Sequence, residues 1–214
     1  MTGHTPRRAI GLAGGARAEA TGQDAAKYSS SNPVVKGLIS RWLAVVAELV
    51  GRDSGIHGDV GVGEGLSLQR VLPPGHAAVG LEYRIGKLRA AVERVPDLHG
   101  VVADAGMLPV RDASFDTVTC LEVLEHLDPA GPAIVELARI TRGRCIVSVP
   151  HEPFFRLGNL ARGKHPRRLG NDAEHVQQFS PSRLRAALGP HFASVETRVV
   201  FPWIVAVGTV EAGR

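Results

Sequence analysis

Apolar positions recur at two alternating periods between residues 56 and 150. Most short apolar runs in this stretch are followed by a segment with helical spacing, and the connections between them are brief. Such alternation is typical of a parallel sheet that helices cover on both faces. The pattern predicts strands at residues 56–60, 77–81, 100–103, 115–121 and 144–149, and helices at residues 66–72, 84–95 and 130–140.

The two ends of the chain depart from this rhythm. A helix is predicted at residues 34–50, with Pro33 at its first position and cap and turn side chains just before it. After Pro150 comes a polar, basic insert at residues 151–179, then a predicted helix at 181–188. Two β-rich runs, 193–200 and 203–210, predict an antiparallel hairpin at the sheet edge. The predicted apolar stripe of the first helix is Val34, Leu38, Trp42, Val45, Val46 and Leu49.

Length and composition point to one soluble domain. The chain has 214 residues, of which 44% are hydrophobic and 21% charged. Residues 1–26 lack a sustained apolar period and are predicted to be a mobile arm, which leaves residues 27–214 as the domain. The sequence has no apolar stretch long enough to span a membrane and no secretory signal, so a cytoplasmic location is expected.

Charge and aromatic content argue against a dedicated nucleic-acid binder, and cysteine content argues against a zinc site. A net charge of +4 is small for a dedicated nucleic-acid binder, and 5% aromatic residues are too few for a stacking platform. Cys120 and Cys145 cannot make a four-thiolate zinc site, and both fall within predicted strands, where a thiol is usually a small core residue. The oligomeric state stays open.

The most informative segment is the glycine-rich run Asp59-Val-Gly61-Val-Gly63-Glu-Gly65, between a predicted strand and a predicted helix. Glycines let the backbone approach a ligand closely, and the helix start offers free N–H groups to ligand oxygens. Glu82 ends the next strand, where it could accept hydrogen bonds from two ribose hydroxyls. Leu66 replaces the third glycine of the dinucleotide fingerprint, and Asp59 suits a ligand with cationic groups, such as a sulfonium and an α-amino group.

Four segments in this order resemble the motifs of class I S-adenosylmethionine-dependent methyltransferases, the broad group that includes ubiquinone-biosynthesis and natural-product enzymes. They are residues 59–65, 81–83, 103–109 and 114–127. The resemblance implies a Rossmann-like methyltransferase fold of the α/β class, with a mostly parallel seven-stranded sheet, an antiparallel last strand and helices on both faces. It also implies S-adenosylmethionine as cofactor, S-adenosylhomocysteine as product, and methyl transfer to an oxygen or nitrogen of a small molecule.

The resemblance further implies a set of cofactor-binding residues. Asp104 would hydrogen-bond the adenine amino group, with the Ala105 backbone nearby, and Tyr83 would pack on the adenosine. Tyr28 would belong to an N-terminal lid, or would be an incidental aromatic residue at a helix entrance. An acidic residue at the end of a buried strand supports the Asp104 assignment, with a cap or turn role as the alternative. The full predicted set is Tyr28, Asp59, Gly61, Gly63, Glu82, Tyr83, Asp104, Ala105 and, at the methionine end, Leu121 and Glu122.

Methyl transfer mainly requires that nucleophile, methyl group and sulfur be held in line, and a hydroxyl acceptor also needs a base. His126 is the predicted base, because it follows the fourth strand at the edge where such sheets bind ligands. His151 and His175 are alternatives, and Glu125-His126 could instead be a structural element. Glu122, Glu125, His126 and His175 also resemble the metal set of small-RNA 2′-O-methyltransferases. The segment around His175 departs from that pattern, so no divalent metal is predicted.

Substrate specificity is predicted to lie in the insert at residues 151–179, where basic side chains accompany Phe154, Phe155, Leu157 and Leu160. This combination suits an acidic, partly hydrophobic acceptor. Contact with an anionic membrane surface, or a solvated loop over the sheet edge, are the alternatives. Two rival functions remain: an RNA or tRNA methyltransferase, which needs a broad basic surface at the cofactor cleft, and a cofactor-binding module without turnover.

Overall fold

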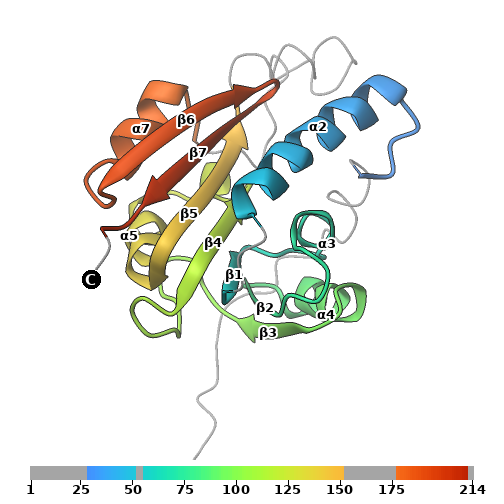
Figure 1. Ribbon diagram of the computed structural model, residues 1–214, viewed down its shortest axis with the longest axis horizontal. Coiled ribbons are helices and arrows are strands. Elements are labelled where there is room, and N and C mark those ends of the chain that lie inside the picture. The colour runs from blue at the N-terminus through green and yellow to red at the C-terminus, as the bar shows by residue number, and fades with distance from the viewer. Residues whose placement is uncertain (1–27, 52–54, 152–176, 212–214) are drawn as a thin grey trace, which may run out of the picture.

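Seven strands form one sheet in the order β3-β2-β1-β4-β5-β7-β6 (Figure 1). The computed structural model describes residues 28–51, 55–151 and 177–211. The strands are β1 (His57–Val60), β2 (Ala78–Glu82), β3 (Leu98–Val102), β4 (Phe115–Leu121), β5 (Thr141–Pro150), β6 (Ser194–Val200) and β7 (Trp203–Thr209). The helices are α2 (Pro33–Val50), α3 (Leu68–Val71), α4 (Ile85–Arg94), the 3-10 helix η1 (Leu124–His126), α5 (Gly131–Ile140) and α7 (Pro181–Leu188).

The sheet is parallel from β3 to β5 and antiparallel beyond it. β1 pairs in parallel with both β2 and β4, whereas β7 runs antiparallel to its neighbours β5 and β6. The chain passes from β1 outward through β2 to β3 and then returns to β4 on the other side of β1. This reversal makes a topological switch point between β1 and β4, where open α/β sheets bind ligands. The predicted fold class, with its antiparallel last strand, is confirmed.

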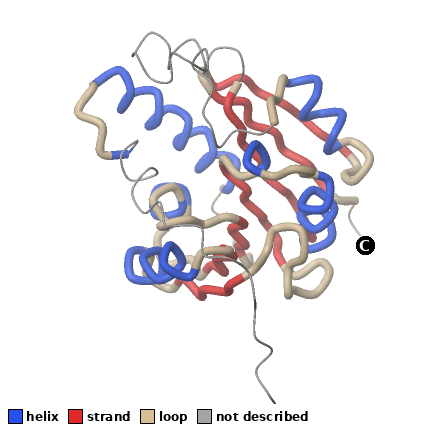
Figure 2. Tube along the Cα trace, turned by 180° about the vertical axis from the view of Figure 1, so that it is seen from behind, coloured by secondary structure: helices blue, strands red, loops and turns tan. Residues whose placement is uncertain are grey.

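Helices cover both faces of the sheet (Figures 1 and 2). Side chains of α2, α3 and α4 pack on one face, against residues such as Leu121 of β4 and Ile146 of β5. Side chains of α5 and α7 pack on the other face, against residues such as Val118 and Val147. Within the described residues, no helix combines the length and the hydropathy that crossing a bilayer requires.

Cys120 and Cys145 are free thiols in adjacent strands, and both are completely buried. Burial raises the pKa of the Cys145 thiol to about 12 and the pKa of the Cys120 thiol well above its ordinary range. Thiols in this state are poor nucleophiles. Their predicted role as small core residues is confirmed.

The buried face of α2 differs from the predicted stripe. Val34 is 67% exposed, whereas Ile39 and Leu43, which the prediction omitted, are buried together with Trp42 and Val46. The helix carries apolar residues on most of its circumference, so spacing alone allowed more than one buried face. The helix start was predicted correctly: Asn32 caps it by accepting hydrogen bonds from the first backbone N–H groups, and Pro33 is its first residue.

A single arginine fastens the long loop between β3 and β4 to helix α5. The Arg139 guanidinium donates to the backbone oxygens of Leu108 and Val110 at 3.0 and 2.7 Å, and to the carboxylates of Glu136 and Asp112. Glu136 also accepts a hydrogen bond from the Leu108 backbone N–H at 2.6 Å. The planar guanidinium, with its five N–H donors, can hold these four partners of Arg139 at once, and no other side chain can.

Replacing Arg139 by lysine should therefore destabilise the fold, because lysine keeps the charge but cannot hold several partners at once. We expect Arg139→Lys to lower the free energy of unfolding by about 1–3 kcal/mol in urea denaturation. Arg142→Lys is the matched control, since Arg142 pairs with Asp116 on the surface, and its effect should stay below about 0.5 kcal/mol. Equal losses of unfolding free energy in the two variants would contradict the role of Arg139 in holding the loop to α5.

Candidate active site

The glycine-rich run forms a tight loop between β1 and α3. Gly61, Gly63 and Gly65 all have positive φ angles, of 75°, 57° and 76°. The Gly61 backbone N–H donates to the carbonyl oxygen of Leu81 at 2.7 Å, which ties the loop to the neighbouring strand. A Cβ atom at Gly61 would clash with Cγ2 of Val123. Glycine at Gly61 is thus required by both backbone conformation and close packing.

Glu82 connects this loop to the end of β2. Its Oε2 atom accepts a hydrogen bond from the Gly63 backbone N–H at 3.0 Å, and its Oε1 atom accepts one from the Arg84 backbone N–H at 2.8 Å. The two bonds fix the carboxylate plane at the carboxyl ends of β1 and β2. A carboxylate offers about four acceptor positions. The fixed group can therefore accept further hydrogen bonds from a ligand.

Asp59 lies inside β1 rather than on the loop. Its side chain is only 3% exposed, and its Oδ1 atom accepts a hydrogen bond from the Thr119 hydroxyl at 2.6 Å. Because the Thr119 hydroxyl uses its only proton in this bond, it accepts a hydrogen bond from Nε2 of His57, at 2.9 Å. A buried chain of three polar side chains thus crosses from β1 to β4 and back.

Burial dominates the acid–base behaviour of this chain. It raises the pKa of Asp59 from 3.8 to about 7, and the nearby Glu82 carboxylate adds to the rise, while the bond from Thr119 opposes it. It lowers the pKa of His57 from 6.5 to about 4, and the neighbouring His76 acts in the same direction. Near neutral pH, Asp59 is therefore poised between its two states, and His57 is neutral.

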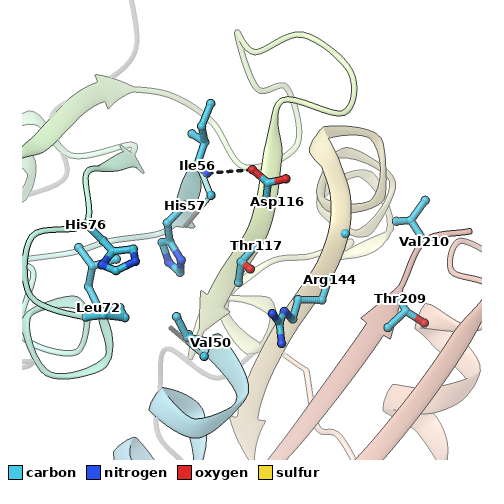
Figure 3. A pocket seen from close by; sticks show the side chains of 14 residues that line it. Val50, Ile56, His57, Leu72, His76, Asp116, Thr117, Arg144, Thr209 and Val210 are labelled. Atoms are coloured by element: carbon cyan, nitrogen blue, oxygen red, sulfur yellow. Dashed lines mark hydrogen bonds between the residues drawn. The ribbon is translucent and has the colours of Figure 1, made fainter. Parts of the chain in front are cut away.

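His57 also lines a cavity of about 490 Å³ at the amino-terminal ends of β1, β4 and β5 (Figure 3). His57 and His76 face one side of it and Arg144 the other. This cavity lies at the opposite edge of the sheet from the glycine loop, because the loop follows the carboxyl end of β1. It is therefore distinct from the predicted cofactor site.

The segment after β3 differs from the prediction in burial. β3 is an edge strand, and Asp104 beyond it is exposed, so the argument that an acidic residue ends a buried strand is wrong. The Asp104 carboxylate accepts a hydrogen bond from the Gly106 backbone N–H at 2.8 Å, which is a local turn. Ala105 is half-buried in that turn, and Tyr83, after β2, is 72% exposed. All three residues still lie at the carboxyl edge of β2 and β3.

The end of β4 brings Leu121 and Glu122 to the same edge. Leu121 is buried and packs in the core on the α2 face, whereas Glu122 is half-buried and has a positive φ of 57°. The Oε1 atom of Glu122 accepts a hydrogen bond from Nε1 of Trp203 at 2.8 Å. Tyr28 lies before α2 with the Arg70 guanidinium 5.6 Å from its ring centre, so it contacts the helix that follows the glycine loop.

The three histidines proposed as candidate bases differ in position and exposure. His126 ends η1 and is exposed just beyond β4, while Glu125 beside it is buried. His151 follows β5, is half-buried and bridges to Phe179. His175, and residues 152–176 of the predicted insert, lie outside the described residues, as does the predicted arm at residues 1–26. Among the described side chains, no three histidine, cysteine, aspartate or glutamate residues form a group that could hold a metal ion.

Sequence reasoning missed several residues around the site. The partners of Asp59 were overlooked, although His57 and Asp59 lie two apart on a strand and must share one side of it. Thr117 and Thr119 show the same alternation on β4. The bond between Trp203 and Glu122 had no local signal, because the two residues lie far apart in sequence.

The sheet order, the switch point and the glycine loop define a Rossmann-like methyltransferase fold, and the comparisons agree. The magnesium protoporphyrin IX methyltransferase from Synechocystis PCC 6803, solved with bound S-adenosylhomocysteine, superposes with a TM-score of 0.64 at 20% identity, over 86% of this chain and 91% of that one. The cyclase SpnF superposes with a TM-score of 0.62 at 14% identity, over 81% of each chain. One fold thus hosts different reactions.

Sequence comparison points to methyltransferases. Residues 58–148 match the family model described as a methyltransferase domain. Demethylmenaquinone methyltransferase from Renibacterium salmoninarum is 33% identical over 135 residues, 61% of this chain and 57% of the relative. Ubiquinone biosynthesis O-methyltransferase from Paracidovorax citrulli is 29% identical over 68% of this chain and 65% of the relative. These matches support a class I S-adenosylmethionine-dependent methyltransferase, and the chain spans less than two thirds of the length of these two relatives.

Asp59 and His57 should give opposite pH dependences of stability. Between pH 4 and 7 the folded state keeps the Asp59 proton that the unfolded chain releases, so the contribution of Asp59 to stability falls as pH rises. Between pH 4 and 6.5 the unfolded chain protonates His57 and the folded state does not, so the contribution of His57 rises with pH.

Urea denaturation across this range would measure both effects. We expect the stability of the wild type relative to Asp59→Asn to fall from pH 4 to 7, and its stability relative to His57→Asn to rise from pH 4 to 6.5. Taking differences between variants removes the contributions of titrating groups that do not interact with the substituted residue. Two difference curves that are flat, or that slope the same way, would contradict the assignment.

Proposed function

We propose that this protein transfers a methyl group from S-adenosylmethionine to a small-molecule acceptor. The observation that carries the proposal is the 3.0 Å bond between the Gly63 backbone N–H and the Glu82 carboxylate, beside the switch point between β1 and β4. It joins the glycine-rich loop to a fixed acceptor suited to ribose hydroxyls. This acceptor beside the loop supports an adenosyl ligand at this edge.

When bound, S-adenosylmethionine supplies a methyl group activated by its sulfonium. Glu82 would accept hydrogen bonds from the two ribose hydroxyls, and Asp104 would accept one from the adenine amino group, with the Ala105 backbone nearby. Asp59, beneath the loop, would act through its charge on the cationic end of the ligand. The remaining proposed contacts are Tyr28, Gly61, Gly63, Tyr83, Leu121 and Glu122.

The names of the relatives support a quinone-like acceptor. One relative is named for demethylmenaquinone and another for ubiquinone biosynthesis, and the latter name specifies oxygen as its methylated atom. A hydroxylated aromatic ring agrees with the partly hydrophobic acceptor that the sequence favours. Oxygen or nitrogen remains the proposed acceptor atom.

For a hydroxyl acceptor, His126 is the proposed base. It is exposed beyond the carboxyl end of β4, so an acceptor at this edge could reach its ring. Its imidazole would take the hydroxyl proton as the acceptor oxygen attacks, and would release that proton to water afterwards. The chain contributes most by holding the acceptor in line with the methyl group.

Glu82→Ala should weaken S-adenosylhomocysteine binding by about tenfold or more, equivalent to about 1.4 kcal/mol, because the ribose loses its acceptor and Gly63 its anchor. Isothermal titration calorimetry on the full chain measures this loss. Glu196→Ala, which removes an exposed carboxylate from β6 near the far edge of the sheet, is the matched control and should bind like the wild type. Equal affinities for the two variants would count against the proposed site.

Release of S-adenosylhomocysteine with a panel of hydroquinones, catechols, amines and RNA tests turnover. We expect release with a hydroxylated aromatic acceptor, and expect His126→Asn to lower kcat by roughly 10²–10⁴-fold. His99→Asn, on the exposed face of edge strand β3, should leave kcat unchanged. Release with RNA alone would favour an RNA methyltransferase, and binding without release across the panel would favour a module without turnover.

A further inference from the structure

The two tryptophans of the chain stack on each other beside the candidate active site. Trp42 belongs to α2 and Trp203 begins β7, and their ring centroids lie 4.6 Å apart with an interplanar angle of 11°. Both side chains are buried, with exposures of 0% and 3%. A buried aromatic stack of this kind holds each ring in one orientation.

Each indole N–H points to a polar group near the carboxyl end of a central strand. Trp42 donates from Nε1 to the Ser148 hydroxyl of β5 at 2.9 Å, and Trp203 donates from Nε1 to Oε1 of Glu122 after β4 at 2.8 Å. A buried indole N–H needs an acceptor, but a neutral hydroxyl satisfies that need for Trp42. A neutral hydroxyl would therefore have been enough for Trp203 as well, and packing of its indole does not explain why the acceptor is a carboxylate.

The backbone of Glu122 is also held in an unusual conformation. Its φ of 57° lies in the left-handed region, which is unfavourable for a residue with a side chain and persists only where the surroundings fix it. The Glu122 backbone N–H donates to the Ser148 carbonyl oxygen at 2.8 Å. The next residue, Val123, packs so closely on Gly61 that a Cβ atom there would clash. Glu122 is thus fixed directly beside the glycine loop.

We propose that Trp203 is a positioning residue, whose indole N–H fixes the Glu122 carboxylate toward the cationic end of the cofactor. Trp42 stacks on Trp203 and keeps its ring in place, so helix α2 takes part in the geometry of the site. The inference rests on the proposed function, because Glu122 needs a ligand at the loop to act upon. It assigns a role to the last strand of the sheet, which lies outside residues 58–148, the range that the methyltransferase family model matches.

Trp203→Phe and Trp42→Phe form a matched pair of variants. Each keeps an aromatic ring in the stack and removes one indole N–H, but only Trp203→Phe removes the hydrogen bond to the Glu122 carboxylate. We expect Trp203→Phe to weaken S-adenosylhomocysteine binding by about fivefold or more in calorimetry, and Trp42→Phe to change it by less than about twofold. In the Glu122→Gln background, Trp203→Phe should cause no further loss, because the two residues act as one unit.

Nuclear magnetic resonance gives a second readout that does not depend on affinity. With only two tryptophans, the chain should give two indole N–H signals, and Trp42→Phe assigns them. We expect the Trp203 signal to move when S-adenosylhomocysteine is added, and to move again in Glu122→Gln, while the Trp42 signal changes little. Because Glu122→Gln keeps both rings, this measurement remains available if Trp203→Phe does not fold.

The outcomes separate the two proposals. A wild type that binds no S-adenosylhomocysteine overturns the proposed function and this inference with it. A wild type that binds, with equal affinity losses in the two phenylalanine variants or with additive losses for Trp203→Phe and Glu122→Gln, overturns the positioning role alone. A Trp203 indole signal that is unchanged in Glu122→Gln overturns it as well.

Discussion

The hydrogen bond between the Gly63 backbone N–H and the Glu82 carboxylate is the constraint on which the rest of the site depends. It joins the loop after β1 to the end of β2, and both lie next to the switch point of the sheet. Without this bond, a loop of three glycines would have a large conformational freedom to lose on binding a ligand. The bond therefore helps to order the glycine loop before any ligand binds.

The carboxylates at this edge of the sheet differ in how deeply they are buried. Glu82 is half-buried, whereas Asp59 is buried in a hydrogen-bonded chain with Thr119 and His57. Burying a carboxyl group without a cationic partner raises its pKa, as it does for Asp59. A cationic ligand above the loop would favour its ionised form. Glu122 adds a third carboxylate, which accepts a hydrogen bond from Trp203.

The sequence predicted the fold where its signals are local. The helix over residues 181–188 and the strand over residues 115–121 have the bounds expected from proline, turn residues and apolar runs. The position of Glu82 at the end of the strand after the loop also followed from spacing. The exposure of Asp104 did not, because the edge position of β3 depends on the topology of the whole sheet. The contacts of Trp203 arise only when β7 inserts between β5 and β6, and no neighbouring residue signals them.

The contact between α2 and the sheet has a consequence for how the domain forms. Trp42 and its hydrogen-bond partner Ser148 are separated by 106 residues, and Trp203 lies further along the chain still. Such high contact order slows folding, because the intervening chain must be ordered before the contact is made. During synthesis on the ribosome, α2 therefore has no complete binding surface until β7 has emerged, and its apolar face stays exposed until then.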